Sequence, residues 1–68
     1  MPTEIVFAAG ASVKVMSGIQ DVGDAVAGKR GTFETSRFAG FRGDEAVAGE
    51  RVILNLEAIA YAIEVAGP

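Results

Sequence analysis

The chain has 68 residues, half of them hydrophobic, and a formal net charge of −3 at pH 7. It contains no Cys and no His, which excludes a disulfide, a Cys- or His-based zinc site and a histidine general base. A chain of this length buries only about 60% of its unfolded surface, and such domains usually gain stability from a disulfide, a metal or a second subunit. We therefore expect a single domain over residues 1–68 that forms a homo-oligomer.

The cellular setting is predicted from what the sequence lacks. No apolar run approaches the roughly 20 residues that a membrane helix needs, and the first residues, MPTEIVF, lack the basic start of a signal peptide. We therefore expect a cytoplasmic protein without membrane contact. The acidic total charge argues against non-specific nucleic-acid binding. Residues 29–42 are locally basic, so a local nucleic-acid-binding patch is not excluded.

The first predicted elements form a β-hairpin. Large hydrophobic side chains at Ile5 and Phe7 share one face of residues 4–9, and Val13 and Val15 alternate with polar residues in 12–15, on either side of Gly10. Two short alternating runs around a glycine are typical of two antiparallel strands. We expect Ile5 and Phe7 to share one face of the first strand, and Val13 and Val15 to face inward from the second with Lys14 outward.

Residues 17–28 predict an α-helix. Ser17 is expected to be the N-cap, and Gln20 lies three positions on, as a capping box requires. Gly28 fits the C′ position just beyond the helix. The inward face should hold three residues at helical spacing: Ile19, Val22 and Val26.

Residues 32–38 predict the third strand. Phe33 and Phe38 are five positions apart, so they lie on opposite faces unless a bulge intervenes. Residues 42–50 are polar and contain glycine, which indicates a connection, and residues 52–54 mark a fourth strand.

Residues 56–65 fit both a strand and a helix. Leu, Glu and Ala favour a helix, whereas alanines alternate with bulky side chains at a period of two. We favour a strand with one bulky face (Ile59, Tyr61, Ile63) and one alanine face. The fold class is then α+β, a small mostly antiparallel β-sheet with one short helix in the order β-β-α-β-β-β.

Two short motifs suggest chemistry that their context does not support. Residues 23–29 spell GxxxxGK, but Arg30 replaces the Ser or Thr that a phosphate-binding loop needs, and the motif closes a helix instead of opening one. We expect no nucleotide cofactor. Arg42-Gly43-Asp44 spells an integrin-binding tripeptide, which we interpret as an ordinary turn.

Catalysis and metal binding are not predicted. The acidic side chains lack the spacing of a calcium loop, and no serine can pair with a histidine because the chain has none. We therefore expect neither an enzyme nor a metalloprotein.

The basic-aromatic segment, residues 29–42, is the sharpest functional signal. Single-strand binders combine cations that pair with phosphates and aromatic rings that stack on bases. The alternative is that the phenylalanines fill the core, and we expect this for at least one of Phe38 and Phe41. The candidate nucleic-acid-binding residues are Lys29, Arg30, Arg37, Phe38, Phe41 and Arg42.

The last third of the chain combines a Gly-polar turn, a strand ending in an apolar-Asn pair, an apolar residue four positions later and a Tyr two beyond that. These are Gly49-Glu50, Leu54-Asn55, Ile59 and Tyr61. The arrangement resembles the small flagellar FlbD/SwrD-like proteins and short actinobacterial proteins, and this resemblance implies a strand-turn-strand unit and a non-enzymatic role. The Pro-Asp-Thr tail of that family is missing, so a flagellar role is not carried over.

These observations lead to one expected function and one alternative. We expect a non-catalytic interaction or assembly protein that associates with itself and has no cofactor, with a further protein partner possible. The alternative is a single-stranded nucleic-acid-binding module that uses the basic-aromatic segment.

Overall fold

The chain folds into one five-stranded antiparallel sheet and one α-helix. The structure is a computed structural model that describes all 68 residues. The strand order in the sheet is β4-β3-β2-β1-β5. The α+β class is confirmed, whereas the element order differs from the expected one by a 3-10 helix, η1, between the last two strands. The elements are β1 (Thr3–Phe7), β2 (Ser12–Val15), α1 (Ile19–Ala27), β3 (Thr32–Arg42), β4 (Glu45–Asn55), η1 (Leu56–Ala58) and β5 (Ile59–Glu64).

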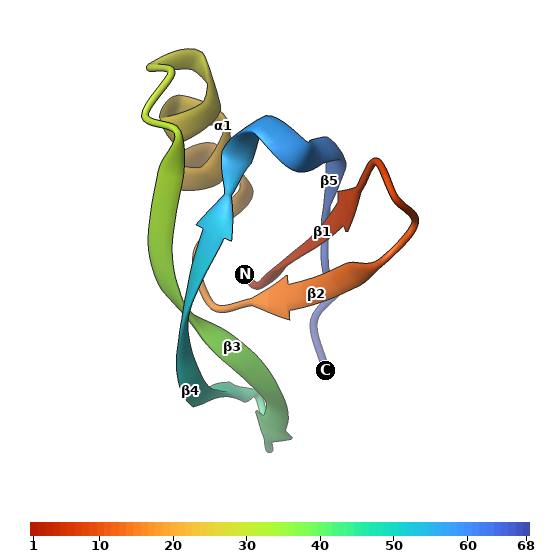
Figure 1. Cartoon of the computed structure of the whole chain (residues 1–68). Coiled ribbons are helices and arrows are strands. Elements are labelled where there is room, and N and C mark those ends of the chain that lie inside the picture. The colour runs from red at the N-terminus through yellow and green to blue at the C-terminus, as the bar shows by residue number, and fades with distance from the viewer.

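The β3–β4 hairpin runs the length of the molecule, with its turn at the end opposite α1 (Figure 1). β2 pairs with β3 only where Val15 lies opposite Arg37, beside a 2.9 Å hydrogen bond from the Met16 N–H to the Ser36 carbonyl. Beyond this joint the hairpin continues without a third strand. We name residues 37–50 the projecting arm.

The segment 42–50 is not the connection that the sequence indicated. It holds a tight turn at Gly43 and Asp44 and the first part of β4. Gly43 has a φ of +63°, the left-handed conformation that glycine adopts most readily in tight hairpin turns. The prediction was wrong because glycine and charged residues are depleted in strands, while pairing with β3 holds them extended here.

Two register shifts bend the hairpin. Between Ser36 and Phe38 the extra residue lies in β4, and between Phe38 and Phe41 it lies in β3, where Gly40 has a φ of +109°. Phe33 and Phe38 therefore lie on opposite faces, whereas Phe38 and Phe41 share a face with their cross-strand partners on β4.

The core is small and lies between the sheet and α1. Val22 of α1 packs with residues from β1, β2 and β4, and α1 also contacts η1 and β5. Ala25 is buried beside Val22, so Ile19 and Val26, which were expected to face inward, lie exposed at the rim of the helix. The buried hydrophobic residues are Ile5, Val15, Val22, Ala25, Leu54 and Leu56.

The N-terminus of α1 differs from the predicted capping box. The N-cap is Gly18, and it makes no side-chain hydrogen bond. The Ser17 hydroxyl instead bonds the hydroxyl of Thr35 at 2.7 Å, and the Thr3 hydroxyl donates to the Ser17 carbonyl at 2.8 Å. Because Thr3 and Thr35 are buried, these bonds satisfy hydroxyls that have no access to water.

Replacing Ser17 with Ala should cost about 1–2 kcal/mol of unfolding free energy, because the buried Thr35 hydroxyl loses its partner. Adding Thr35→Val should recover part of the loss, so urea melts of the two single variants and the double variant should show a coupling of about 1 kcal/mol. If Ser17 acted as a helix cap instead, the two losses would simply add.

The C-terminus of α1 is a Schellman motif that ends on a lysine. The Lys29 N–H donates to the Val26 carbonyl, and the Arg30 N–H donates to the Ala25 carbonyl. Lys29 has a φ of +52°, whereas Gly28 has ordinary helical angles. The predicted C′ residue is therefore wrong by one position, and the left-handed conformation falls on a residue with a Cβ.

Replacing Lys29 with Gly should stabilise the protein by about 0.5–1 kcal/mol, because glycine adopts the left-handed conformation without steric strain. Gly31→Ala is the opposite control. Gly31 has a φ of +81°, so adding a Cβ there should destabilise the protein. Thermal melts of both variants measure the two shifts, and a Lys29→Gly variant that melts earlier would contradict this account.

The C-terminal segment forms a strand from Ile59, which confirms the preferred interpretation, after the 3-10 turn η1. The Asn55 side chain accepts a hydrogen bond from the Glu57 N–H and so caps this turn. The expected single bulky face is wrong, because a register shift leaves Ala60 as an extra residue in β5. No helix has the length and hydrophobicity to cross a membrane.

Candidate interaction surface

The structure spreads the candidate nucleic-acid-binding residues along the whole β3–β4 hairpin. Lys29 and Arg30 follow α1 at one end, and Arg42 closes β3 at the other. Arg37 lies at the joint between β2 and β3, and Phe38 follows it on the projecting arm. The six residues therefore do not form one site.

Phe38 and Phe41 pack on each other, outside the core. Their ring centroids are 5.0 Å apart with planes at 68°, an edge-to-face arrangement. Both side chains are half-buried, and neither packs against the core cluster, whereas Phe7 and Phe33 do. The expectation that one of this pair lies in the core is wrong, and the β3 phenylalanine that packs there is Phe33.

Two of the three arginines on the hairpin are already paired, whereas Arg42 has no ion-pair partner. Arg37 bonds Glu50, and Arg51 bonds Glu34, each across the two strands. The hydrogen bond and positive charge of Arg37 lower the pKa of the Glu50 carboxyl below its usual value. Both pairs are solvent-exposed and contribute little to stability, but they neutralise the positive charge of Arg37 and Arg51.

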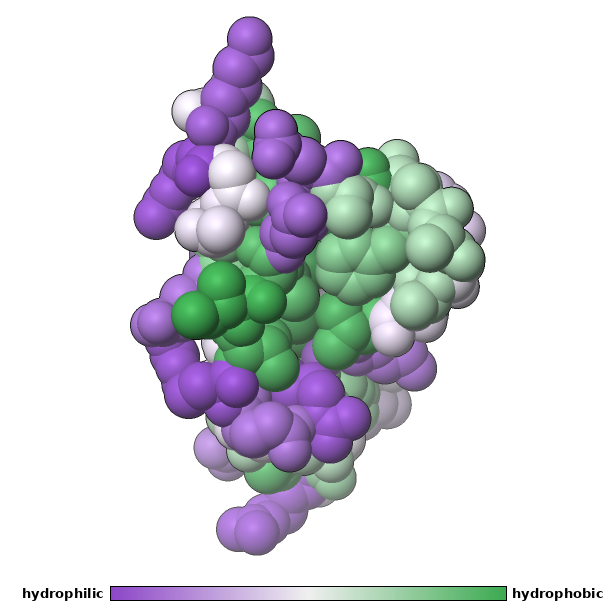
Figure 2. Space-filling view, viewed as in Figure 1, coloured by the Kyte–Doolittle hydropathy of each residue, from purple (hydrophilic) through white to green (hydrophobic).

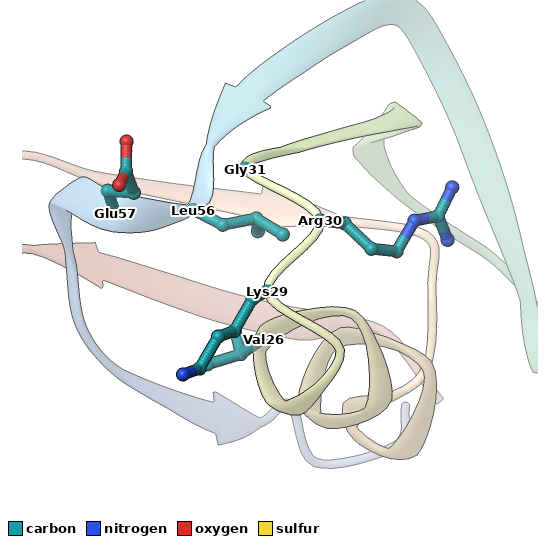
Figure 3. A pocket seen from close by; sticks show the side chains of 6 residues that line it. All are labelled: Val26, Lys29, Arg30, Gly31, Leu56 and Glu57. Carbon is teal, nitrogen blue, oxygen red and sulfur yellow. The ribbon is translucent and has the colours of Figure 1, made fainter.

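A shallow hollow of about 240 Å³ lies between the end of α1 and η1 (Figure 3). The side chains of Lys29 and Arg30 leave the backbone in opposite directions, and Glu57 points away from both. A ligand site needs polar groups that converge on one position, and this hollow has none. No three potential metal ligands gather anywhere in the chain.

A second hollow, of about 270 Å³, opens where β2 and the projecting arm separate. It brings two candidate residues, Arg37 and Phe38, together with Lys14, which the sequence did not single out. Lys14 lies outside the basic-aromatic segment, and only the pairing of β2 with β3 brings it near. Glu4 also lines the hollow, so its charge is mixed.

Large hydrophobic side chains remain exposed on several elements. Ile53, on β4, is the most exposed at 70%, and Figure 2 shows a strongly hydrophobic area over this part of β4, bordered by hydrophilic residues. Ile53 lies opposite Glu34, whose carboxylate bonds Arg51. Charged groups therefore border it.

Two further exposed residues lie side by side on the edge strand β5. Tyr61 is 55% exposed and Ile63 46%, and Tyr61 lies opposite the half-buried Val6 of β1. We name these three residues the β5 strip. They share the outer face of the sheet, because Ile5 and its partner Ala62 face the core.

Comparison with protein-family models, with curated proteins and with solved structures gave no match. The β5 strip combines two exposed large hydrophobic side chains with an edge strand that is hydrogen-bonded on one side only, whereas the other edge strand, β4, carries one, Ile53. The sequence pattern placed Tyr61 and Ile63 on one face, but the bulge at Ala60 decides that this face points outward.

Proposed function

We propose that this protein is a non-catalytic interaction protein that associates with itself through the β5 strip. The observation that supports the proposal is the exposed pair Tyr61 and Ile63 on an edge strand. Native proteins usually protect sheet edges with charges, proline or a covering element. Residues 58–63 contain neither a charged residue nor a proline.

Because the core is small, a second copy that covers apolar surface would increase the stability of the folded chain. Only nine of the 68 residues are buried in the single chain, and neither a disulfide nor a metal site adds stability. Covering the β5 strip with a second copy removes apolar surface from water at about 25 cal/mol per Å². A six-residue strand covers less than a standard interface of about 800 Å² per partner, so we expect micromolar affinity.

Sedimentation equilibrium at high micromolar concentration should give twice the 7.0 kDa mass of one chain. Tyr61→Lys and Ile63→Lys should each raise the dissociation constant at least about tenfold, because each places a charge on the contact. The matched control is Ile53→Lys on β4, a change of the same kind at a more exposed residue, which should leave the mass doubled.

Two results would contradict the proposal. A mass of one chain at high concentration would exclude self-association altogether. Dissociation by Ile53→Lys, with no effect of Ile63→Lys, would move the contact to β4. Circular dichroism of each variant separates loss of association from loss of fold.

Single-stranded nucleic-acid binding is a second candidate, supported by the hollow that joins Lys14, Arg37 and Phe38. Fluorescence anisotropy with a labelled single-stranded oligonucleotide tests it at low and physiological salt. Lys14→Ala should weaken any binding and reduce its salt dependence by about one phosphate contact. An absence of binding at low salt, where phosphate contacts are strongest, would exclude this candidate.

A further inference from the structure

We propose that two copies join edge to edge, with β5 of one chain antiparallel to β5 of the other about a two-fold axis at Ala62. This inference rests on the proposed self-association and specifies its geometry. Since β5 is hydrogen-bonded only to β1, the pairing would extend each five-stranded sheet into one continuous sheet through both copies.

The other edge strand, β4, is less suited to this role. It carries charged side chains at Glu45, Glu50 and Arg51, and one of the two register shifts of the hairpin places an extra residue in it. Charges and bulges are features that keep an edge from pairing. In β5 the regular segment after the bulge runs from Tyr61 to Glu64 and carries its single charge at its end.

The register follows from side-chain chemistry. In an antiparallel pair centred on Ala62, Tyr61 of one copy lies opposite Ile63 of the other, and the same pair recurs across the axis. Opposed residues share a face, so both pairs lie on the outer face, and each row of side chains runs from Val6 and Tyr61 of one copy to Ile63 and Glu4 of the other. Aromatic residues opposite β-branched residues are favourable cross-strand pairs.

Charge supports the same register. With Ala62 at the centre, Glu64 lies opposite Ala60 of the other copy, and Glu57 lies beyond the paired segment. Moving the centre to Tyr61 would bring Glu64 opposite Ala58, next to Glu57 of the other copy, and would place the bulge within the pairing. A parallel arrangement would set the two Glu64 carboxylates against each other, which is unfavourable.

The absence of native cysteine allows a direct test. At the axis the two Ala62 Cα atoms would be about 4.5–5.5 Å apart, within the range that a disulfide spans. The Ala62→Cys variant should therefore form a disulfide-linked dimer under mild oxidation, at least about tenfold faster than random collision allows. Non-reducing gel electrophoresis over time measures this rate.

The matched control is Ala60→Cys, an Ala-to-Cys change on the same strand. In the proposed register its two copies lie about 14 Å apart along the strand, too far for a disulfide. Fast cross-linking of Ala62→Cys with slow cross-linking of Ala60→Cys supports the proposal. The reverse order, or equal rates, overturns it.

Hydrogen exchange of the unmodified protein provides a second measurement if Ala62→Cys fails to fold. The amides of residues 60–64 should exchange more slowly at high than at low concentration. A doubled mass without protection of β5 overturns the edge pairing but leaves self-association in place. A mass of one chain overturns both.

Discussion

Replacing Ile5 with Ala should cost about 3–4 kcal/mol and leave much of the protein unfolded at 25 °C. Ile5 is fully buried and packs with Val15, Val22 and Leu54 at the centre of the only core. A buried Ile-to-Ala change loses the transfer free energy of the deleted carbons and leaves a cavity, at a typical cost of about 2–5 kcal/mol. Domains of this size have only a few kcal/mol of stability in total.

Ile53→Ala is the control for this prediction, because it is the same substitution on the exposed face of β4. It should change the unfolding free energy by less than about 0.5 kcal/mol. Urea titrations followed by circular dichroism compare the two variants at equal protein concentration, since self-association would otherwise add to the apparent stability. Similar losses for Ile5→Ala and Ile53→Ala would show that the core is misassigned.

The second large effect is a difference in stability loss between alanine substitutions of two phenylalanines on β3, Phe33 and Phe41. Phe33→Ala should cost about 3 kcal/mol, because its ring packs against the core cluster. Phe41→Ala should cost only about 1 kcal/mol, mainly the lost edge-to-face contact with Phe38. Thermal melts of the two variants compare the stability losses directly, because both are Phe-to-Ala changes on the same strand.

The phenylalanine comparison also bears on nucleic-acid binding. A stable Phe41→Ala variant retains the fold, so any loss of oligonucleotide affinity would report a lost stacking contact worth about 1–3 kcal/mol. Equal destabilisation by Phe33→Ala and Phe41→Ala would contradict the assignment of Phe41 to a surface pair.

Period-two alternation predicted β1 and β2 and favoured a strand over a helix for β5, because each strand has one face toward the core. It failed for the first part of β4, where residues 45–51 extend along an arm with no core beneath it. Without a buried face the alternation disappears, and only pairing with β3 holds the segment extended.

The error at the start of α1 has a tertiary cause. Ser17 and Gln20 satisfy the local rule for a capping box, but the Ser17 hydroxyl bonds Thr35 of β3 instead. That bond satisfies a buried hydroxyl, whereas the N-terminal amides of a surface helix can bond water. No local pattern around residue 17 indicates a partner 18 positions away.

The candidate site could be predicted only in part, because neighbours in the sequence need not converge in space. Residues on one strand are separated by about 3.3 Å each, so an 11-residue strand such as β3 spreads its side chains over most of the molecule. The β5 strip depends on the extra residue Ala60, which turns Ile59 inward and leaves Tyr61 outward. A one-residue bulge of this kind has no clear sequence signal when the inserted residue is an alanine.

The pairing of β1 with β5 sets the order in which the chain can fold. Thr3 lies opposite Glu64, so the sheet must bring the two most distant strands of the chain together. Closing so long a loop costs entropy before any contact is gained, and topologies dominated by such pairs fold slowly. During synthesis on a ribosome, α1 and the β3–β4 hairpin can form before β5 has been made, and until then the outer edge of β1 remains unpaired. A nascent chain halted before residue 59 would leave β1 as an exposed sheet edge, open to pairing with other chains.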